Sequence, residues 1–275
     1  MGKWVALPTI VGIEGASGGE HSNLGLESET SVFDIHSHVL PEVDDGPKSW
    51  EVAVEMCQMA VSDGITHMVA TPHANDRYAY DRPYLQELLD QLQEKVGVTP
   101  KLSLGCDLHL SYENLERVLE EPHRYTIGAT NYLLVELSNF SVPIRIGDCF
   151  TRLGDLGLTP ILTHPERNSI LQQNPQRVLE WVEQGCLVQV TASALTGLWG
   201  ERPEIIARWL LDRSAIHFLA TDAHDTKRRV PILSHGRDVA AQIAGTEYAQ
   251  ALVEANPAAV VRGEPIPFSP KPVMD

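Results

Sequence analysis

Cysteine pairs, long apolar runs and an excess of basic residues are all missing from this sequence. Its four cysteines, Cys57, Cys106, Cys149 and Cys186, are far apart and form no Cys-x-x-Cys pair. This spacing argues against a disulfide framework or a zinc knot and favours unpaired thiols in a reducing compartment. No apolar run approaches the roughly 18 residues of a membrane span, and residues 1–30 lack the features of a signal peptide. We therefore expect a cytoplasmic protein that does not insert into a membrane.

Acidic residues outnumber basic ones, 37 to 21, and the formal net charge is −16. A negative surface repels phosphate backbones and anionic lipids, so a role at nucleic acid or at a membrane surface is not expected. Bound metal cations could still attract an anion locally. A length of 275 residues with 43% apolar composition suffices for one α/β barrel, which often exceeds about 200 residues as a single domain.

Short apolar runs alternate with helical stretches from Val32 onward. The predicted strands are Val32–His38, Thr66–Pro72, Lys101–Leu104, Tyr132–Leu137, Pro160–Thr163, Cys186–Val190 and His217–Thr221. The predicted helices are Trp50–Ser62, Pro83–Lys95, Tyr112–Glu120, Gly147–Leu156, Pro175–Gln184, Pro203–Asp212 and Val239–Ala255. About seven βα units predict a parallel sheet that closes on itself as a barrel.

The two ends of the chain differ in composition from this alternating part. Residues 1–30 are rich in glycine and polar side chains, and we expect a flexible extension there. Pro257–Asp275 contains five prolines and is expected to be extended. We assign the main domain to residues 31–262 and the C-terminal tail to residues 263–275.

Side chains that bind metals recur at the ends of the predicted strands. They are His36, His38, His73, Asp107, Glu136, His164, Asp222 and His224. A strand repeats its facing every second residue, so His36 and His38 leave one face together. The carboxyl ends of parallel strands meet at one rim of a barrel, where active sites are built. His67 lies near the start of its predicted strand, and we assign it to the opposite end with no function.

Each motif taken singly has a simpler interpretation. A His-x-His pattern recurs by chance, and Asp44-Asp45-Gly46-Pro47 has the composition of a turn. Thr71-Pro72-His73 is compatible with a strand that ends at a proline and a surface imidazole. Glu136 is harder to explain in this way, because a carboxylate inside an apolar parallel strand needs a partner or a metal to offset its desolvation. The joint occurrence at successive strand ends indicates a metal site.

Several of these motifs together resemble a known superfamily. They are Asp34-Ile35-His36-Ser37-His38, Asp44-Asp45-Gly46-Pro47, Thr71-Pro72-His73, Thr163-His164-Pro165-Glu166-Arg167 and Thr221-Asp222-Ala223-His224. The combination resembles the polymerase-and-histidinol-phosphatase (PHP) superfamily. Within it, residues 32–262 are most similar to the bacterial protein tyrosine phosphatases tied to capsular and exopolysaccharide synthesis. The resemblance implies a distorted (β/α)₇ TIM-like barrel with three divalent metal ions, usually manganese and sometimes iron, zinc or magnesium.

The resemblance also implies a role for each ligand. His36 and His38 would hold the first metal, together with Asp222 and a bridging carboxylate. Glu136 and His164 would hold the second metal. Asp45, His73 and His224 would hold the third.

The bridging position departs from the family pattern. The relatives usually have glutamate there, whereas this chain offers Asp107, whose side chain is one methylene shorter. His109 shares the strand face of Asp107 and is the second choice as a ligand. Arg167 and Arg229 match arginines that resemble the phosphate-binding pair of the family.

The mechanism of the phosphatase that the resemblance implies can be argued from charge, because a phosphate monoester carries about two negative charges. Its hydrolysis needs a nucleophile near neutral pH and positive charge around the transferring phosphoryl oxygens. Clustered divalent metals supply a bridging hydroxide and clamp the attacking and leaving oxygens, and Arg167 would fork onto the phosphoryl oxygens. His109 or a metal-held water would protonate the leaving group. We predict a metal-dependent protein tyrosine phosphatase whose substrate is a phosphotyrosine protein, for example the tail of a bacterial tyrosine kinase.

Three other enzyme classes fit the sequence less well. A cysteine-dependent tyrosine phosphatase needs an arginine six positions after a cysteine, and these positions hold Asp63, Tyr112, Asp155 and Ala192. An amidohydrolase commonly bridges its metals with a lysine at a central strand end, and no lysine here has that place. A nuclease or polymerase-editing module is disfavoured by the acidic surface.

Two alternatives stay open. One is a histidinol-phosphate-type phosphatase of the same superfamily, although those enzymes tend to have histidine at the strand end where this chain has Glu136. The other is a metal-stabilised regulatory scaffold without catalysis, because an intact ligand set does not require turnover. The sequence leaves the association of subunits open.

Overall fold

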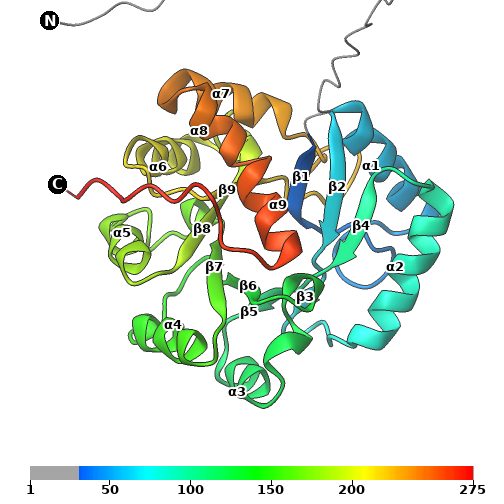
Figure 1. The fold of residues 1–275 in the computed structure, drawn as a ribbon, viewed down its shortest axis with the longest axis horizontal. Coiled ribbons are helices and arrows are strands. Elements are labelled where there is room, and N and C mark those ends of the chain that lie inside the picture. The colour runs from blue at the N-terminus through cyan, green and yellow to red at the C-terminus, as the bar shows by residue number, and fades with distance from the viewer. Residues whose placement is uncertain (1–30, 275) are drawn as a thin grey trace, which may run out of the picture. The chain divides into compact units, whose positions relative to one another are not determined.

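The computed structural model describes residues 31–274, so the extension predicted for residues 1–30 lies outside the described residues. The strands are β1 Val32–Ser37, β2 Ile65–Ala70, β3 His73–Ala74, β4 Lys101–Leu104, β5 Asp107–His109, β6 Tyr132–Glu136, β7 Thr159–Thr163, β8 Leu187–Thr191 and β9 Phe218–Ala220. The helices are α1 Trp50–Ser62, α2 Arg82–Val96, α3 Tyr112–Glu120, α4 Ile146–Asp155, α5 Gln176–Glu183, α6 Glu201–Asp212, α7 Ser234–Ala244, α8 Thr246–Ala251 and α9 Ala255–Arg262. Figure 1 shows the strands inside a ring of helices.

The strands form a parallel barrel of seven positions. Two sheets have the orders β1-β2-β4 and β3-β5-β6-β7-β8-β9, and their pairs are parallel. Only Thr71 and Pro72 separate β2 from β3, and only Gly105 and Cys106 separate β4 from β5, so each pair occupies one position. A bridge between Ser37 and Ala223 connects the first strand to the segment after the last. The predicted distorted (β/α)₇ barrel is therefore confirmed.

The two interrupted strands break at a proline and at a glycine. Pro72 has no backbone N–H and cannot continue the strand ladder as a donor. At Gly105 a Cβ atom would lie 3.1 Å from side-chain atoms of Val69 and Ile127, so glycine permits a close approach of the chain. After these interruptions β3 pairs with β5, and His73 lies directly opposite Asp107. The interruptions thus bring a histidine and a carboxylate side by side.

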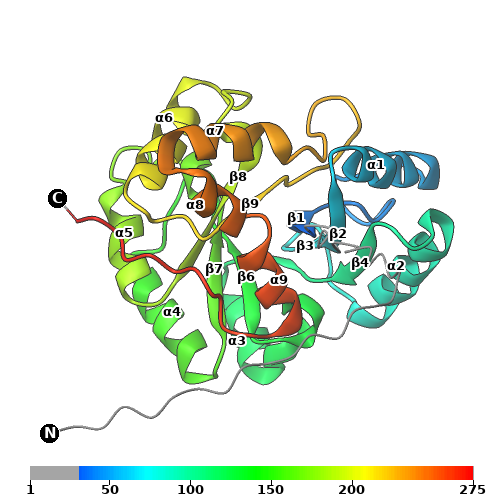
Figure 2. The same ribbon diagram turned by 45° about the horizontal axis from the view of Figure 1, so that its top comes forward.

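The barrel interior changes from apolar to polar along the strands. Its apolar cluster is Ile35, Val69, Ile127, Tyr132, Leu134, Ile161, Leu187, Phe218, Ala220 and Val260. Val260 comes from α9, and the Tyr132 hydroxyl donates to the Glu264 carbonyl at 2.6 Å, so α9 and the residues after it cover the amino end (Figure 2). Burying each large side chain there contributes about 1.5–3 kcal/mol. Glu136 lies two residues beyond Leu134 on the same strand face, where the polar end begins.

Two parts of the prediction were wrong. The single helix predicted for Val239–Ala255 is instead the three helices α7, α8 and α9. Gly245 ends α7 with φ 92°, a conformation that favours glycine. Pro257, expected in an extended segment, lies in the first turn of α9, where its missing N–H costs no helical hydrogen bond.

The other predicted strands and helices are present, with ends shifted by at most two residues, whereas β3 and β5 were not predicted. Residues 263–274 contain neither helix nor strand. None of the helices between residues 31 and 274 has the length and apolarity needed to cross a bilayer.

Candidate metal centre

The nine predicted ligands come together at the carboxyl ends of the strands. They form four overlapping groups, within each of which the ligand atoms lie within 4.8 Å of one another. The groups are His38, Asp45, His73 and His224; His36, His38 and Asp107; His36, His164 and Asp222; and His73, Asp107 and Glu136. Among residues 31–274 these groups contain the nine predicted residues and no other.

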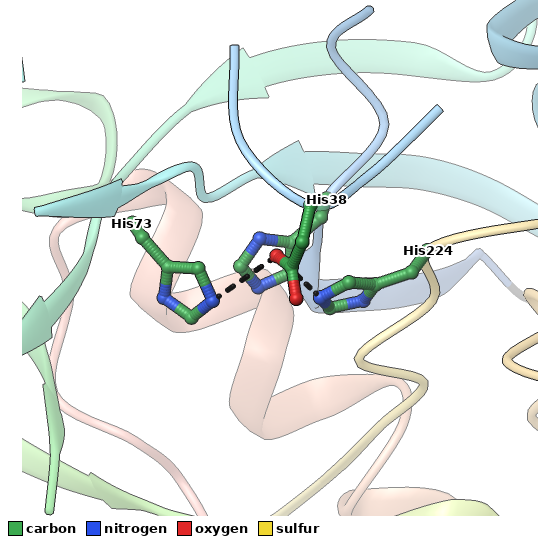
Figure 3. A group of neighbouring side chains, drawn as sticks. His38, His73 and His224 are labelled. Carbon is green, nitrogen blue, oxygen red and sulfur yellow. Dashed lines mark ion pairs between the residues drawn. The ribbon is translucent and has the colours of Figure 1, made fainter. Parts of the chain in front are cut away.

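The first group lies at the mouth of the site. Asp45 Oδ1 is 3.4 Å from His73 Nε2 and 3.3 Å from His224 Nε2, and dashed lines in Figure 3 mark these ion pairs. The ring of His38 lies 4.4 Å from that of His73 and 3.9 Å from that of His224, measured between centroids. Asp45 is 49% exposed, whereas the histidines are nearly buried. Contacts from His224 and His73 hold the pKa of Asp45 well below its usual range.

Asp107 links two of the groups from a fully buried position. Its Oδ2 lies 3.5 Å from His36 Nε2 and 3.3 Å from His73 Nδ1. Burial raises the pKa of this carboxyl, but His36 and His73 outweigh burial and the net pKa is well below its usual range. His109, the second choice for the bridging position, contacts Glu136 Oε2 through Nδ1 at 3.5 Å and belongs to none of the four groups. The geometry supports Asp107 over His109 as the shared ligand.

Glu136 and His164 are grouped differently from the expected pairing. Glu136 Oε2 lies 3.7 Å from His73 Nδ1, and Glu136 Oε1 lies 3.9 Å from His164 Nε2. His164 shares its group with His36 and Asp222 instead. The geometry brings all these ligands together, but it does not reproduce the expected division among three ions.

Two ligands have left-handed backbone conformations. His164 has φ 36° and directly follows β7. Asp222 has φ 49° and comes two residues after the end of β9. Such a conformation is uncommon outside glycine and costs about 1–3 kcal/mol. At both positions it turns the chain while the side chain stays in the cluster.

The donor set fits divalent metal ions. Buried atoms His73 Nδ1, Asp107 Oδ2 and His224 Nε2 have no hydrogen-bond partner within the described part of the chain. Their nearest neighbours lie at 3.3–3.5 Å, as the distances above show. Two ligands of one ion with bonds of about 2.1 Å are separated by about 3.0–3.4 Å. Mixed imidazole and carboxylate ligation suits manganese, iron or zinc better than an ion that prefers oxygen alone.

A second layer of hydrogen bonds orients the histidines. His38 Nδ1 is 2.7 Å from Asp44 Oδ2, His36 Nδ1 is 2.9 Å from Gln189 Oε1, and His224 Nδ1 is 2.9 Å from the carbonyl oxygen of Asp222. Since each acceptor requires a proton on Nδ1, the Nε2 atom of each ring keeps a free lone pair directed into the cluster.

Sequence reasoning did not assign a site role to Gln189 or Asp44. Gln189 is a polar residue in the fully buried strand β8, which is the same signal that singled out Glu136. Asp44 was predicted to belong to a turn, and its Oδ1 does accept the Gly46 N–H at 2.9 Å. Its Oδ2 also accepts the His73 N–H at 3.1 Å, so one carboxylate serves both the turn and the cluster.

Both predicted arginines converge on one ligand. Arg167 and Arg229 donate through Nη2 to Asp222 Oδ2, the latter at 2.5 Å. The other oxygen, Oδ1, lies 3.4 Å from Nε2 of both His36 and His38. Asp222 therefore connects the histidine cluster to two guanidinium groups. Trp199, which sequence reasoning missed, lies against both arginines.

His67 lies apart from the cluster. It is in the first half of β2, and its Nε2 is 2.7 Å from Ser103 Oγ. It belongs to none of the groups formed by residues 31–274, as its assignment to the other end required.

The sequence is similar to a family model and to named proteins. The family described as "Capsular polysaccharide synthesis, CpsB/CapC" matches residues 32–262. The chain is 34% identical over 204 residues to the putative tyrosine-protein phosphatase CapC of Staphylococcus aureus, an alignment that covers 72% of this chain and 79% of that protein. It is 32% identical over 202 residues to the tyrosine-protein phosphatase YwqE of Bacillus subtilis (strain 168), with coverage of 72% and 79%.

Solved structures show the same similarity. A structure from a study of YwqE from Bacillus subtilis and CpsB from Streptococcus pneumoniae, described as unique metal-dependent tyrosine phosphatases, superposes with a TM-score of 0.81 at 30% identity. It covers 88% of this chain and 100% of that one. Histidinol phosphate phosphatase from Lactococcus lactis superposes with a TM-score of 0.51 at 13% identity, over 79% of this chain and 94% of that one. The second likeness concerns the fold alone.

Proposed function

Because the chain belongs to the CpsB/CapC family of capsular polysaccharide synthesis, we propose that it is a metal-dependent protein tyrosine phosphatase linked to capsule or exopolysaccharide regulation. The resemblance inferred from the motifs is confirmed by this membership. One observation carries the proposal: nine ligand side chains converge at one rim, and two arginines meet them at Asp222. A phosphotyrosine protein, for example a bacterial tyrosine kinase tail, is the substrate that we propose, in a cytoplasmic setting that the unpaired cysteines favour.

We assign three divalent ions, manganese first among the candidates, to the nine ligands. Asp107 supports a shared position, because it reaches both His36 and His73. His38 belongs to two of the groups, and the Asp44 contact directs its Nε2 into the cluster. When bound, such ions supply Lewis-acid charge and lower the pKa of a water towards 7.

Arg167 and Arg229 provide the binding site for the phosphoryl oxygens in this proposal. A guanidinium group forks onto phosphate oxygens with two parallel hydrogen bonds. The two side chains are 10% and 27% exposed, so they are partly shielded from water but open to an incoming anion. Their contact with Asp222 keeps them at the edge of the ligand cluster.

His109 is the candidate that protonates the leaving group. Its ring is about one-third exposed, with the Nδ1 atom near Glu136, so it lies at the rim beside the cluster rather than within it. A phenolate leaves more readily than an alkoxide, and an aryl ester therefore needs only modest help from an acid. Loss of His109 should slow substrates with poor leaving groups more than p-nitrophenyl phosphate.

The direct test is metal-dependent hydrolysis of p-nitrophenyl phosphate by the purified protein. We expect activity with manganese, loss of activity with a chelator, and loss in a His164→Ala variant. His123→Ala is the matched control, because His123 is exposed on the segment that precedes β6. Elemental analysis that finds about three metal ions per chain supports the assignment. A manganese-loaded protein without turnover would favour the scaffold alternative.

Substrate choice needs a separate comparison. A phosphotyrosine peptide should be hydrolysed with a higher kcat/KM than histidinol phosphate. A strong preference for histidinol phosphate would overturn the assignment to tyrosine phosphatases while leaving the metal centre intact.

A further inference from the structure

One indole ring lies against both candidate phosphate-binding arginines. The Cζ atom of Arg167 is 4.2 Å from the centroid of the Trp199 ring, and that of Arg229 is 5.3 Å away. Both distances are within the limit of about 6 Å for a cation–π contact. Arg167 follows β7, Arg229 follows β9, and Trp199 lies between β8 and α6, so three separate loops meet at this ring.

The ring is held in place independently of the arginines. Trp199 Nε1 donates to Ser193 Oγ at 3.0 Å, and the ring packs against the main hydrophobic cluster. Gly197 with φ 80° and Gly200 with φ 93° flank it, conformations that glycine adopts without steric cost. Trp199 is therefore a fixed surface against which long side chains can be ordered.

The two arginines also share an acceptor, which draws their guanidinium groups together. Both guanidinium groups reach the same oxygen, Asp222 Oδ2, and two positive groups at one acceptor repel each other. The negative face of an indole attracts both cations and orients their planes. Arg167 Nε also lies 4.0 Å from Glu166 Oε1, and Asp225, four residues before Arg229, accepts backbone N–H groups of Lys227 and Arg228 at 2.6 Å.

The arrangement is also accessible to a ligand. A pocket of about 330 Å³ lies beside the ring and is lined by Leu198, Trp199, Asp225, Arg228 and Arg229. An anion that enters this pocket can therefore contact both Trp199 and Arg229.

We propose that Trp199 is a positioning residue that orders Arg167 and Arg229 for binding phosphoryl oxygens without contacting the phosphoryl group itself. The inference rests on the proposed function in that it takes the arginine pair as the phosphate-binding site. Trp199 acts on binding of the phosphate group, which all phosphate monoesters share, and not on the leaving group. Loss of the Trp199 ring should therefore weaken the binding of aryl and alkyl phosphates to the same extent.

The variants for the test are Trp199→Leu and Trp199→Phe, with Trp209→Leu as the matched control. Trp209 in α6 also has an arginine against its ring, because the Cζ atom of Arg213 lies 4.1 Å from the ring centroid. Trp209 also packs against the main hydrophobic cluster. The control therefore loses a similar stack outside the site. Thermal unfolding and metal content of each variant show whether the fold and the cluster are retained.

With manganese-loaded protein, Trp199→Leu should lower kcat/KM for p-nitrophenyl phosphate and for an alkyl phosphate about tenfold each. The inhibition constant of inorganic phosphate should rise by a similar factor. Trp199→Phe should recover most of the loss, and Trp209→Leu should match the unchanged protein. A loss confined to aryl substrates would overturn the inference, because it would indicate contact with the leaving group.

Calorimetric titration with inorganic phosphate separates this inference from the proposed function. If the unchanged protein hydrolyses no monoester but its phosphate affinity falls about tenfold in Trp199→Leu, the proposed function fails and the inference stands. If Trp199→Leu binds phosphate as Trp209→Leu does, the inference is overturned, whether or not the protein is a phosphatase.

Discussion

The two ends of the barrel interior are built on the same strand faces but have opposite chemistry. In β6, Tyr132 and Leu134 belong to the apolar amino end, and Glu136 on the same face belongs to the ligand cluster. In β9, Phe218 and Ala220 are apolar, and Asp222 follows on the same face. The apolar end stabilises the barrel by burial, whereas the polar end gathers carboxylates that favour cations. Two residues along a strand separate a structural layer from a functional one.

Buried histidines at the two ends of the barrel differ in part. Burial lowers the pKa of His67 and of His217 to about 4 at the amino end. Burial also acts on His38 and His73, but neighbouring carboxylates, among them Asp44 for the former and Asp107 for the latter, raise their pKa to about 9 and about 11. At the same end, burial outweighs the carboxylates beside His224 and His164, so the pKa of His224 falls to about 4 and that of His164 lies well below its usual range.

The largest effect is expected at the polar end. Asp222→Ala removes a proposed ligand and the shared acceptor of both arginines, so activity should fall at least about 10³-fold while the fold is retained. Steady-state kinetics with circular dichroism measures both. Asp238→Asn, in which an exposed carboxylate of α7 is lost, should leave activity unchanged. If the activity of Asp222→Ala were within tenfold of that of the unchanged protein, Asp222 would not be a metal ligand.

A substitution at the apolar end should reverse this pattern. Leu134→Ala leaves a cavity in the closed interior and should lower the free energy of unfolding by about 3 kcal/mol. Leu134 lies opposite Asp107 in the β5–β6 pair but supplies no metal-binding atom, so metal ions per folded chain should not change. Denaturant unfolding and elemental analysis test the two parts. If folded Leu134→Ala protein lost metal, metal binding would depend on the packing of the apolar end.

Gln189 lies at the boundary between the layers. Gln189→Leu removes the acceptor of His36 Nδ1 and leaves the ring without an orienting partner. Removing a residue that hydrogen-bonds a metal ligand typically lowers metal affinity about 10–100-fold. Competition with a fluorescent chelator measures the affinity for manganese. Val190→Leu, a buried change on the other face of β8, is the control and should leave metal affinity unchanged.

The last effect concerns His217 and depends on pH. Its pKa is about 4 in the folded protein and 6.5 in the reference state, so the unfolded chain binds more protons between these values. The stability from neutral His217 is therefore present above pH 6.5 and is lost as pH falls towards 4, by at most about 1.4 kcal/mol per pH unit. His217→Asn does not titrate, and its unfolding free energy should depend less on pH in this window. Denaturant unfolding of chelated protein from pH 7 to 4 measures the slopes, and equal slopes would contradict the shift.

Much of the fold could be predicted because its signals are local. The bounds of α1, β4 and α3 follow from apolar periodicity, and Ser49 and Ser111 cap α1 and α3 as hydroxyl residues do. The break at Gly245 was missed because the apolar pattern continues across it. The strand interruptions at Pro72 and Gly105 were missed because contacts of these residues with neighbouring strands decide them.

The site divides in the same way. Residue type and position at strand ends predicted most of the ligand cluster, since strand parity and parallel direction place such side chains at one rim. Asp45 and both arginines were predicted through the family resemblance. Only the tertiary structure decided that Asp107 rather than His109 lies between His36 and His73, that Gln189 supports His36, and that Trp199 lies against both arginines. These contacts join residues from different strands and loops, and their distances depend on how the barrel closes. The pattern along one strand carries no information about them.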